Sequence, residues 1–176
     1  MKTFRLSLFL VVVAVSTNNS FAQSQAIRAD KVSLETDSQA FSFDVQYSAT
    51  NDDRSATGVG FVTCFDSGQL TFVNVTNERV THRVVPATEP VRDLDDSDGD
   101  AKTDMCFSAA YFDLVGNFPN EPLPLRLFSA NFVTKKGFDE TAVNFAKTSN
   151  DAAFKFESSP VKASRRDPRA RTVRGE

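Results

Sequence analysis

The chain has 176 residues, of which 40% are hydrophobic and 24% charged, and its 23 acidic residues outnumber the 20 basic ones. This length suits one ordinary domain with a substantial core. The formal net charge of −3 argues against nucleic-acid binding, because nucleic-acid-binding domains present a basic surface.

The first residues have the order of a secretory signal peptide. Lys2 and Arg5 precede an apolar run over residues 6–15, and polar and small residues follow up to Ala22. A membrane-spanning helix needs roughly 20 apolar residues, about twice the length of this run. The sequence therefore predicts cleavage after Ala22, a signal peptide over residues 1–22, and a secreted protein, extracellular or periplasmic, without a membrane span.

Charge is distributed unevenly along the mature chain. Residues 161–176 contain six basic and two acidic side chains, whereas the body before them is acidic. This last segment has no apolar periodicity, which predicts a domain over residues 23–160 followed by a disordered basic tail over residues 161–176. Such a tail can bind a polyanion or simply remain solvated, and the sequence leaves both open.

The middle of the chain reads as short strands. Runs rich in Phe, Val and Thr alternate with polar residues and end at Asn, Asp, Gly or Pro. In residues 41–47 the apolar side chains all fall on one face, which we expect to be core. Residues 58–65 and 69–76 flank an Asp-Ser-Gly connection, which predicts a hairpin.

Further strand candidates follow at residues 79–85, 105–112, 125–134, 141–146 and 152–157, and no segment reads as a long amphipathic helix. Many short strands with turns between them are typical of a β-sandwich or barrel. The 17 phenylalanines and the absence of tryptophan favour a core packed between two sheets over a sugar-stacking surface. We therefore expect an all-β fold, a two-sheet β-sandwich of about eight to nine strands.

The two cysteines, Cys64 and Cys106, lie in neighbouring strand candidates. An exported chain with an even cysteine count usually pairs them, so we expect one disulfide. In the chain-entropy model a bridge of this span contributes about 4 kcal/mol to stability. A cysteine nucleophile or a thiolate metal site would have to rely on His82, the single histidine.

The strongest chemical signal is the acidic segment of residues 93–104, which places six carboxylates around Gly99. Calcium takes six to eight oxygen ligands, and alternating Asp residues with a Gly at a sharp bend suit it. The predicted site is a structural calcium site formed by Asp93, Asp95, Asp96, Asp98, Asp100 and Asp104. The alternative is a solvated acidic loop without a metal.

The segment does not fit a regular EF-hand. With Gly99 in the sixth place of the loop, Leu94 takes the first place and Met105 the twelfth. It is more similar to the Asp-rich calcium loops of thrombospondin type 3 and dockerin repeats, without matching either along its full length. Its expected role is to hold the long connection before Cys106.

Three stretches together resemble the cohesin-like β-sandwich modules of bacterial cell-surface and extracellular proteins. They read FSFDVQYS, TGVGFVTCFDSGQLTFVNVTN and DLVGNFPNEPLPLRLFSANFVT, and the resemblance covers residues 28–157. It implies a jelly-roll sandwich that is not an enzyme and acts by binding another protein or a glycan. The disulfide, the acidic insert and the basic tail are not expected of a cellulosomal cohesin, which puts dockerin binding in question.

Two functions are consistent with these features. The first is a secreted non-catalytic module of the cell surface or extracellular matrix that binds an extracellular protein or assembles with itself, with the segment before Phe41 as a candidate donor strand for edge pairing. The second is a calcium-dependent carbohydrate-binding module. An enzyme is disfavoured because the chain has no G-x-S-x-G, H-E-x-x-H or P-loop motif.

Overall fold

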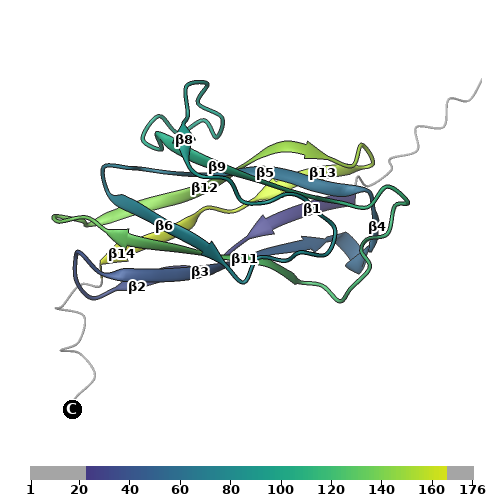
Figure 1. Cartoon of the computed structure of the whole chain (residues 1–176), viewed down its shortest axis with the longest axis horizontal. Coiled ribbons are helices and arrows are strands. Elements are labelled where there is room, and N and C mark those ends of the chain that lie inside the picture. Colours follow the sequence, from purple (N-terminus) through teal and green to yellow (C-terminus); the bar gives the residue numbers. More distant parts are fainter. Residues whose placement is uncertain (1–22, 166–176) are drawn as a thin grey trace, which may run out of the picture.

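A computed structural model describes residues 23–165, apart from the side chains of Arg83 and Val84. Two β-sheets pack face to face as a sandwich, and the strands run along its long axis (Figure 1). The expected signal peptide lies outside the described residues. Within them, no helix has the length and apolar character needed to cross a membrane.

The first sheet has five strands in the order β13-β1-β3-β11-β6. Their bounds are β13 Phe154–Ser158, β1 Gln23–Arg28, β3 Ala40–Ala49, β11 Leu125–Thr134 and β6 Leu70–Thr76. All neighbours are antiparallel except β1 and β13, which run parallel.

The second sheet follows the order β2-β14-β12-β5-β9-β7, and β8 also pairs with β9. Their bounds are β2 Val32–Leu34, β14 Val161–Arg165, β12 Glu140–Asn150, β5 Gly58–Phe65, β9 Met105–Phe112, β7 Arg83–Val85 and β8 Val91–Arg92. A small separate ladder joins β4 Ser55–Ala56 to β10 Phe118–Pro119, and a short 3₁₀ turn, η1, covers Thr50–Asp52.

Aromatic side chains fill the space between the two sheets, as the sequence predicts. Phe132 of β11 stacks near Phe43 of β3 and meets Phe65 of β5 edge-on, with ring centroids 5.8 and 5.2 Å apart. Phe61 of β5 stacks on Phe128 of β11, with ring centroids 6.1 Å apart. Alternation along each strand sends these rings inward and leaves the intervening residues on the outer faces.

The predicted hairpin between residues 58–65 and 69–76 is wrong. The amides of Gln69 and Leu70 do donate to the carbonyl of Asp66, so the turn forms. However, β5 is already paired on both sides, with β9 and β12, and β6 pairs with β11 in the opposite sheet. The turn therefore carries the chain across the sandwich, where Phe72 faces Phe65 with ring centroids 6.3 Å apart.

The segment before Phe41 is not a free donor strand. Residues 23–28 form β1, which is hydrogen-bonded on both sides, and residues 32–34 form β2, which pairs with β14. The strand expected over 79–85 is also shorter than predicted, because β7 begins at Arg83 after His82 adopts a positive φ of 60°. Residues 23–165 contain 14 strand segments, several of them only two or three residues long, where eight to nine strands were expected.

The predicted start of the disordered tail at residue 161 also needs correction. Residues 161–165 form β14, which pairs with β12 on one side and β2 on the other. Val161 and Ala163 point into the core and are almost fully buried. These two apolar side chains are enough to hold β14 in the sheet, because β12 and β2 supply the hydrogen bonds of its main chain. The rest of the predicted tail lies outside the described residues.

Truncation tests this correction directly. A chain ending at Pro160 loses the burial of Val161, which stabilises the fold by about 1.5–3 kcal/mol, together with the β12–β14 ladder. We expect its melting temperature to fall by about 5–10 °C. A chain ending at Arg165 keeps every described strand and is the matched control, with a change below about 2 °C. Equal melting temperatures for the two truncations would show that β14 adds no stability.

Candidate functional site

The disulfide lies on the outer face of the second sheet. Cys64 of β5 and Cys106 of β9 stand directly opposite in the antiparallel register, and their sulfurs are bonded. Their neighbours Thr63 and Phe107 are buried on the inner face, so the cysteines point away from the core. Both cysteines are nevertheless buried, because the loop of residues 93–104, here called the acidic loop, covers them.

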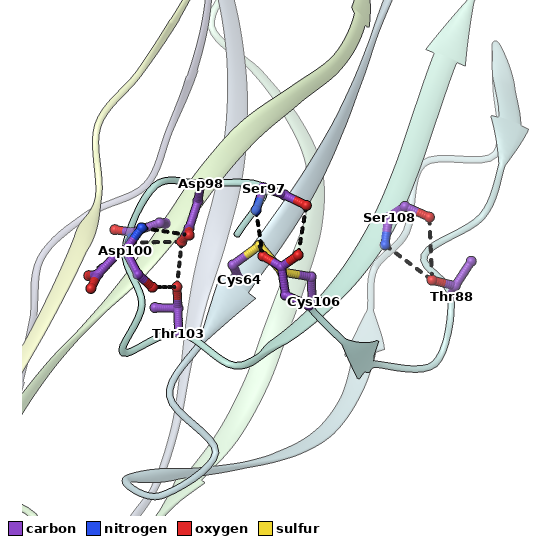
Figure 2. Close-up of a disulfide and its surroundings, with 10 residues drawn as sticks. Cys64, Thr88, Ser97, Asp98, Asp100, Thr103, Cys106 and Ser108 are labelled. Carbon is purple, nitrogen blue, oxygen red and sulfur yellow. Dashed lines mark hydrogen bonds between the residues drawn. A yellow bond between two sulfur atoms is a disulfide. The ribbon is translucent and has the colours of Figure 1, made fainter. Parts of the chain in front are cut away.

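Asp93 fastens the start of the acidic loop over this bridge. One of its carboxylate oxygens lies 3.3 Å from the sulfur of Cys106 and 4.0 Å from that of Cys64. The amide and hydroxyl of Ser97 both donate to the same carboxylate at 2.8 Å, and Figure 2 shows Ser97 beside the disulfide. The amide of Asp93 donates to the carbonyl of Asp104, which closes the neck of the loop.

The middle of the acidic loop folds back onto β12. The side-chain amide of Asn144 donates to Asp98 at 2.9 Å and to Asp100 at 3.3 Å, so two carboxylates share one partner. The hydroxyl of buried Thr103 donates to Asp98 at 2.6 Å (Figure 2). This inner turn is therefore anchored by a strand that lies more than 40 residues further along the chain.

Asp104 joins the end of the loop to the turn between β5 and β6. Desolvation raises the pKa of Asp104, but it is outweighed by the amide and hydroxyl of Ser67, which donate at 2.7 and 2.8 Å, together with the backbone amide of Asp104 itself and the charge of Arg92. The pKa therefore lies below its ordinary value and the carboxylate is charged at neutral pH. Its hydrogen bonds make Asp104 a fixed part of the loop's base.

The tip of the acidic loop is exposed. Leu94 is 83% exposed and is followed by the exposed carboxylates Asp95 and Asp96. Val91 of β8, just before the neck, is 65% exposed. The connections on either side of β8 project from the body of the sandwich (Figure 1). The loop thus presents apolar side chains and negative charge on a base that is tied to three strands.

The six predicted metal ligands do not gather at one point. Asp93, the pair Asp98 and Asp100, and Asp104 have separate partners, while Asp95 and Asp96 are at the exposed tip. Within residues 23–165, the group of potential ligand atoms that lie within 4.8 Å of one another is Cys64, Asp93 and Cys106, and its two sulfurs are bonded to each other. Only Asp98 and Asp100 share a partner.

His82 stands apart from this site. Its Nδ1 lies 3.4 Å from a carboxylate oxygen of Asp113, and its ring meets Phe118 edge-on. Sequence reasoning missed Asn144, Ser67 and Thr103, which hold the loop. Alternation between Val143 and Phe145 could have placed Asn144 on the outer face, but nothing in the sequence identifies its partners.

No family model matches the chain, and no curated protein sequence matches it. Solved structures do. A type III cohesin module from the cellulosomal ScaE cell-surface anchoring scaffoldin of Ruminococcus flavefaciens is similar with a TM-score of 0.56 and 12% identity, over 86% of this chain and 93% of that one. The chain has a cohesin-like fold.

Two further cohesins have the same arrangement. The sixth cohesin of scaffoldin B from Acetivibrio cellulolyticus, in complex with a dockerin, has a TM-score of 0.52 and 12% identity over 81% of this chain and 99% of that one. The seventh ScaB type I cohesin from Pseudobacteroides cellulosolvens has a TM-score of 0.51 and 8% identity over 81% and 92%. These likenesses confirm the predicted cohesin-like sandwich, and none of the three supports the carbohydrate-binding alternative.

Proposed function

We propose that this chain is a secreted, non-catalytic module that binds another protein at the cell surface or in the extracellular space. The observation that carries the proposal is the cohesin-like fold, together with the fact that one of the similar cohesins is bound to a dockerin and another belongs to a cell-surface anchoring scaffoldin. The signal-peptide pattern and the disulfide agree with export.

The acidic loop is the surface we propose for this contact. Binding energy at protein interfaces is concentrated in a few anchor side chains that become buried on binding, and Leu94 is a large apolar side chain that is exposed at the tip of this loop. The base of the loop is fixed by Asp93, Asn144 and Ser67. A loop that is already ordered loses less conformational entropy on binding than a flexible one. The partner that fits is a protein with an apolar pocket bordered by basic side chains.

Replacement of Leu94 tests the proposed contact. The mature protein, residues 23–176, is used to capture partners from its own extracellular fraction, and the dissociation constant of each captured protein is then measured. We expect Leu94→Ser to weaken binding by about tenfold or more, because an anchor residue contributes at least about 1.4 kcal/mol.

Leu114→Ser is the matched control. Leu114 is 86% exposed, as accessible as Leu94, but it lies in the connection between β9 and β10. We expect this variant to bind like the original protein. Equal affinity of the Leu94→Ser variant and the original protein for every captured partner would contradict the proposed surface.

We also propose that calcium stabilises the acidic loop through Asp98 and Asp100. Two carboxylates that share the side-chain N–H group of Asn144 repel each other, and carboxylate oxygens are ligands that calcium prefers. The carboxylate oxygens of Asp98 and Asp100, together with water, would hold the ion, and the ion's role would be to neutralise this charge. Extracellular calcium is high enough to fill even a weak site.

Melting curves with calcium or chelator test this proposal. Calcium at about one hundred times its dissociation constant adds roughly 2.7 kcal/mol of stability, which is visible as a higher melting temperature. The double variant Asp98→Asn, Asp100→Asn should lose this response. The control with the same change in charge, Asp95→Asn, Asp96→Asn, should retain it, because those carboxylates lie at the exposed tip. An unchanged melting curve in chelator and no heat of binding at millimolar calcium would contradict a calcium site.

A further inference from the structure

The two sheets expose four edges, and three of them carry features that oppose pairing with another strand. The edge formed by β7 and β8 is interrupted by Pro86 and Pro90, which cannot donate a hydrogen bond. The β2 edge is three residues long. The β13 edge carries Lys155 and Glu157 among its five residues. Natural sheets use these devices to prevent edge-to-edge association.

The fourth edge, β6, has none of these features. It is seven residues long, LTFVNVT, with no charge and no proline, and among the described residues its one neighbouring strand is β11. Its one irregularity is a β-bulge, because the register passes from Asn131–Asn74 to Phe132–Phe72 and leaves Val73 without a partner in the ladder with β11. A bulge is a milder device than a proline or a charged side chain, since it removes no main-chain donor and adds no charge at the edge. The outer side of β6 therefore offers main-chain groups to an added strand.

The side chains of β6 favour a partner that is also uncharged. Thr71, Val73, Asn74 and Thr76 are exposed, and Val73 is 53% exposed. Beside them there is a shallow depression of about 450 Å³, lined by Val73 and by polar residues that include Ser42, Asn74 and Asn131. Residues 23–165 hold 21 acidic and 14 basic side chains, and none of them lies on β6.

We propose that β6 pairs antiparallel with β6 of a second copy of this chain, across a twofold axis centred on Val73. A twofold axis makes the same strand serve as both donor and acceptor, and the two first sheets then join into one continuous sheet. Because β6 carries no charge, no like charges are brought opposite each other at the junction, whereas pairing of two β13 strands would set charged side chains at the interface.

Self-assembly was one of the functions that the sequence predicted for a non-catalytic module, and β6 is the strand we infer for it. The inference rests on the proposed non-catalytic binding function. Its test uses the purified mature chain alone, whereas the acidic-loop proposal is tested with a partner protein. The β6 edge and the acidic loop belong to different sheets, so a failure at one surface is distinguishable from a failure at the other.

Sedimentation equilibrium of residues 23–176 at about 0.15 M salt, where the Debye length is about 8 Å, tests the proposal. We expect a monomer–dimer equilibrium with a dissociation constant below about 100 μM. Val73→Lys places like charges opposite each other at the junction and should weaken the dimer by about fivefold or more. The control Val115→Lys, at a residue that is 76% exposed away from this edge, should leave the dimer unchanged.

Hydrogen exchange identifies the edge in the same samples. The amides of β6 should exchange more slowly as the protein concentration rises, while those of β7 and β8 should not change. Circular dichroism of each variant confirms that it is folded. A monomer at every concentration, a dimer that Val73→Lys does not weaken, or β6 exchange that is independent of concentration would each overturn the proposal.

Discussion

The disulfide between Cys64 and Cys106 joins two core strands, β5 and β9, at the place where the acidic loop packs on the outer face of the second sheet. The two residues stand opposite each other near one end of the β5–β9 ladder, one pair before Phe65 and Met105, and the same register sends Phe61, Phe65 and Phe107 into the core. Since alternation fixes which residues face outward, the bridge has to lie on the outer face. A shift of one residue would bury the cysteines between the sheets and expose the aromatic rings.

The acidic loop depends on that placement. Its neck closes beside the disulfide, where Asp93 and Asp104 face each other across a main-chain hydrogen bond. Asp93 covers the sulfurs, Asn144 of β12 holds the inner turn, and Ser67 holds the end. These attachments come from β5, β9 and β12 and from the turn between β5 and β6, so the loop is built on neighbouring inner strands of the second sheet while Leu94 remains exposed. Such a base suits a surface that another protein recognises.

Much of the fold could be predicted from the sequence because strand alternation and turn residues are local signals. The inward face of residues 41–47 and the long strand ending at Thr134 rest on such signals, whereas the cysteine pairing follows from the even cysteine count of an exported chain. The hairpin prediction failed because alternation does not tell which sheet a strand joins, and the connection after Phe65 crosses between sheets. The β14 strand was hidden because its basic residues dominate its composition, while Val161 and Ala163 are too few to give a periodic signal.

The acidic loop was recognised by composition, but its organisation was not. Six carboxylates around one glycine predict a single cluster, whereas the structure distributes them among Ser67, Ser97, Thr103 and Asn144. Those partners come from distant parts of the chain or are common polar residues with no distinctive spacing. Only the tertiary pairing of β5 with β12 brings Asn144 to Asp98, and sequence patterns do not encode that pairing.

We expect the contacts that Asp93 makes beside the disulfide to keep the acidic loop ordered. Amide hydrogen exchange in the original protein and in an Asp93→Ala variant measures this most directly. Exchange should become faster in residues 93–104 while the amides of β5 and β9 stay protected, because the disulfide itself remains intact. Unchanged exchange in the loop would contradict the claim, since the loop would then be ordered without the carboxylate that joins it to the bridge.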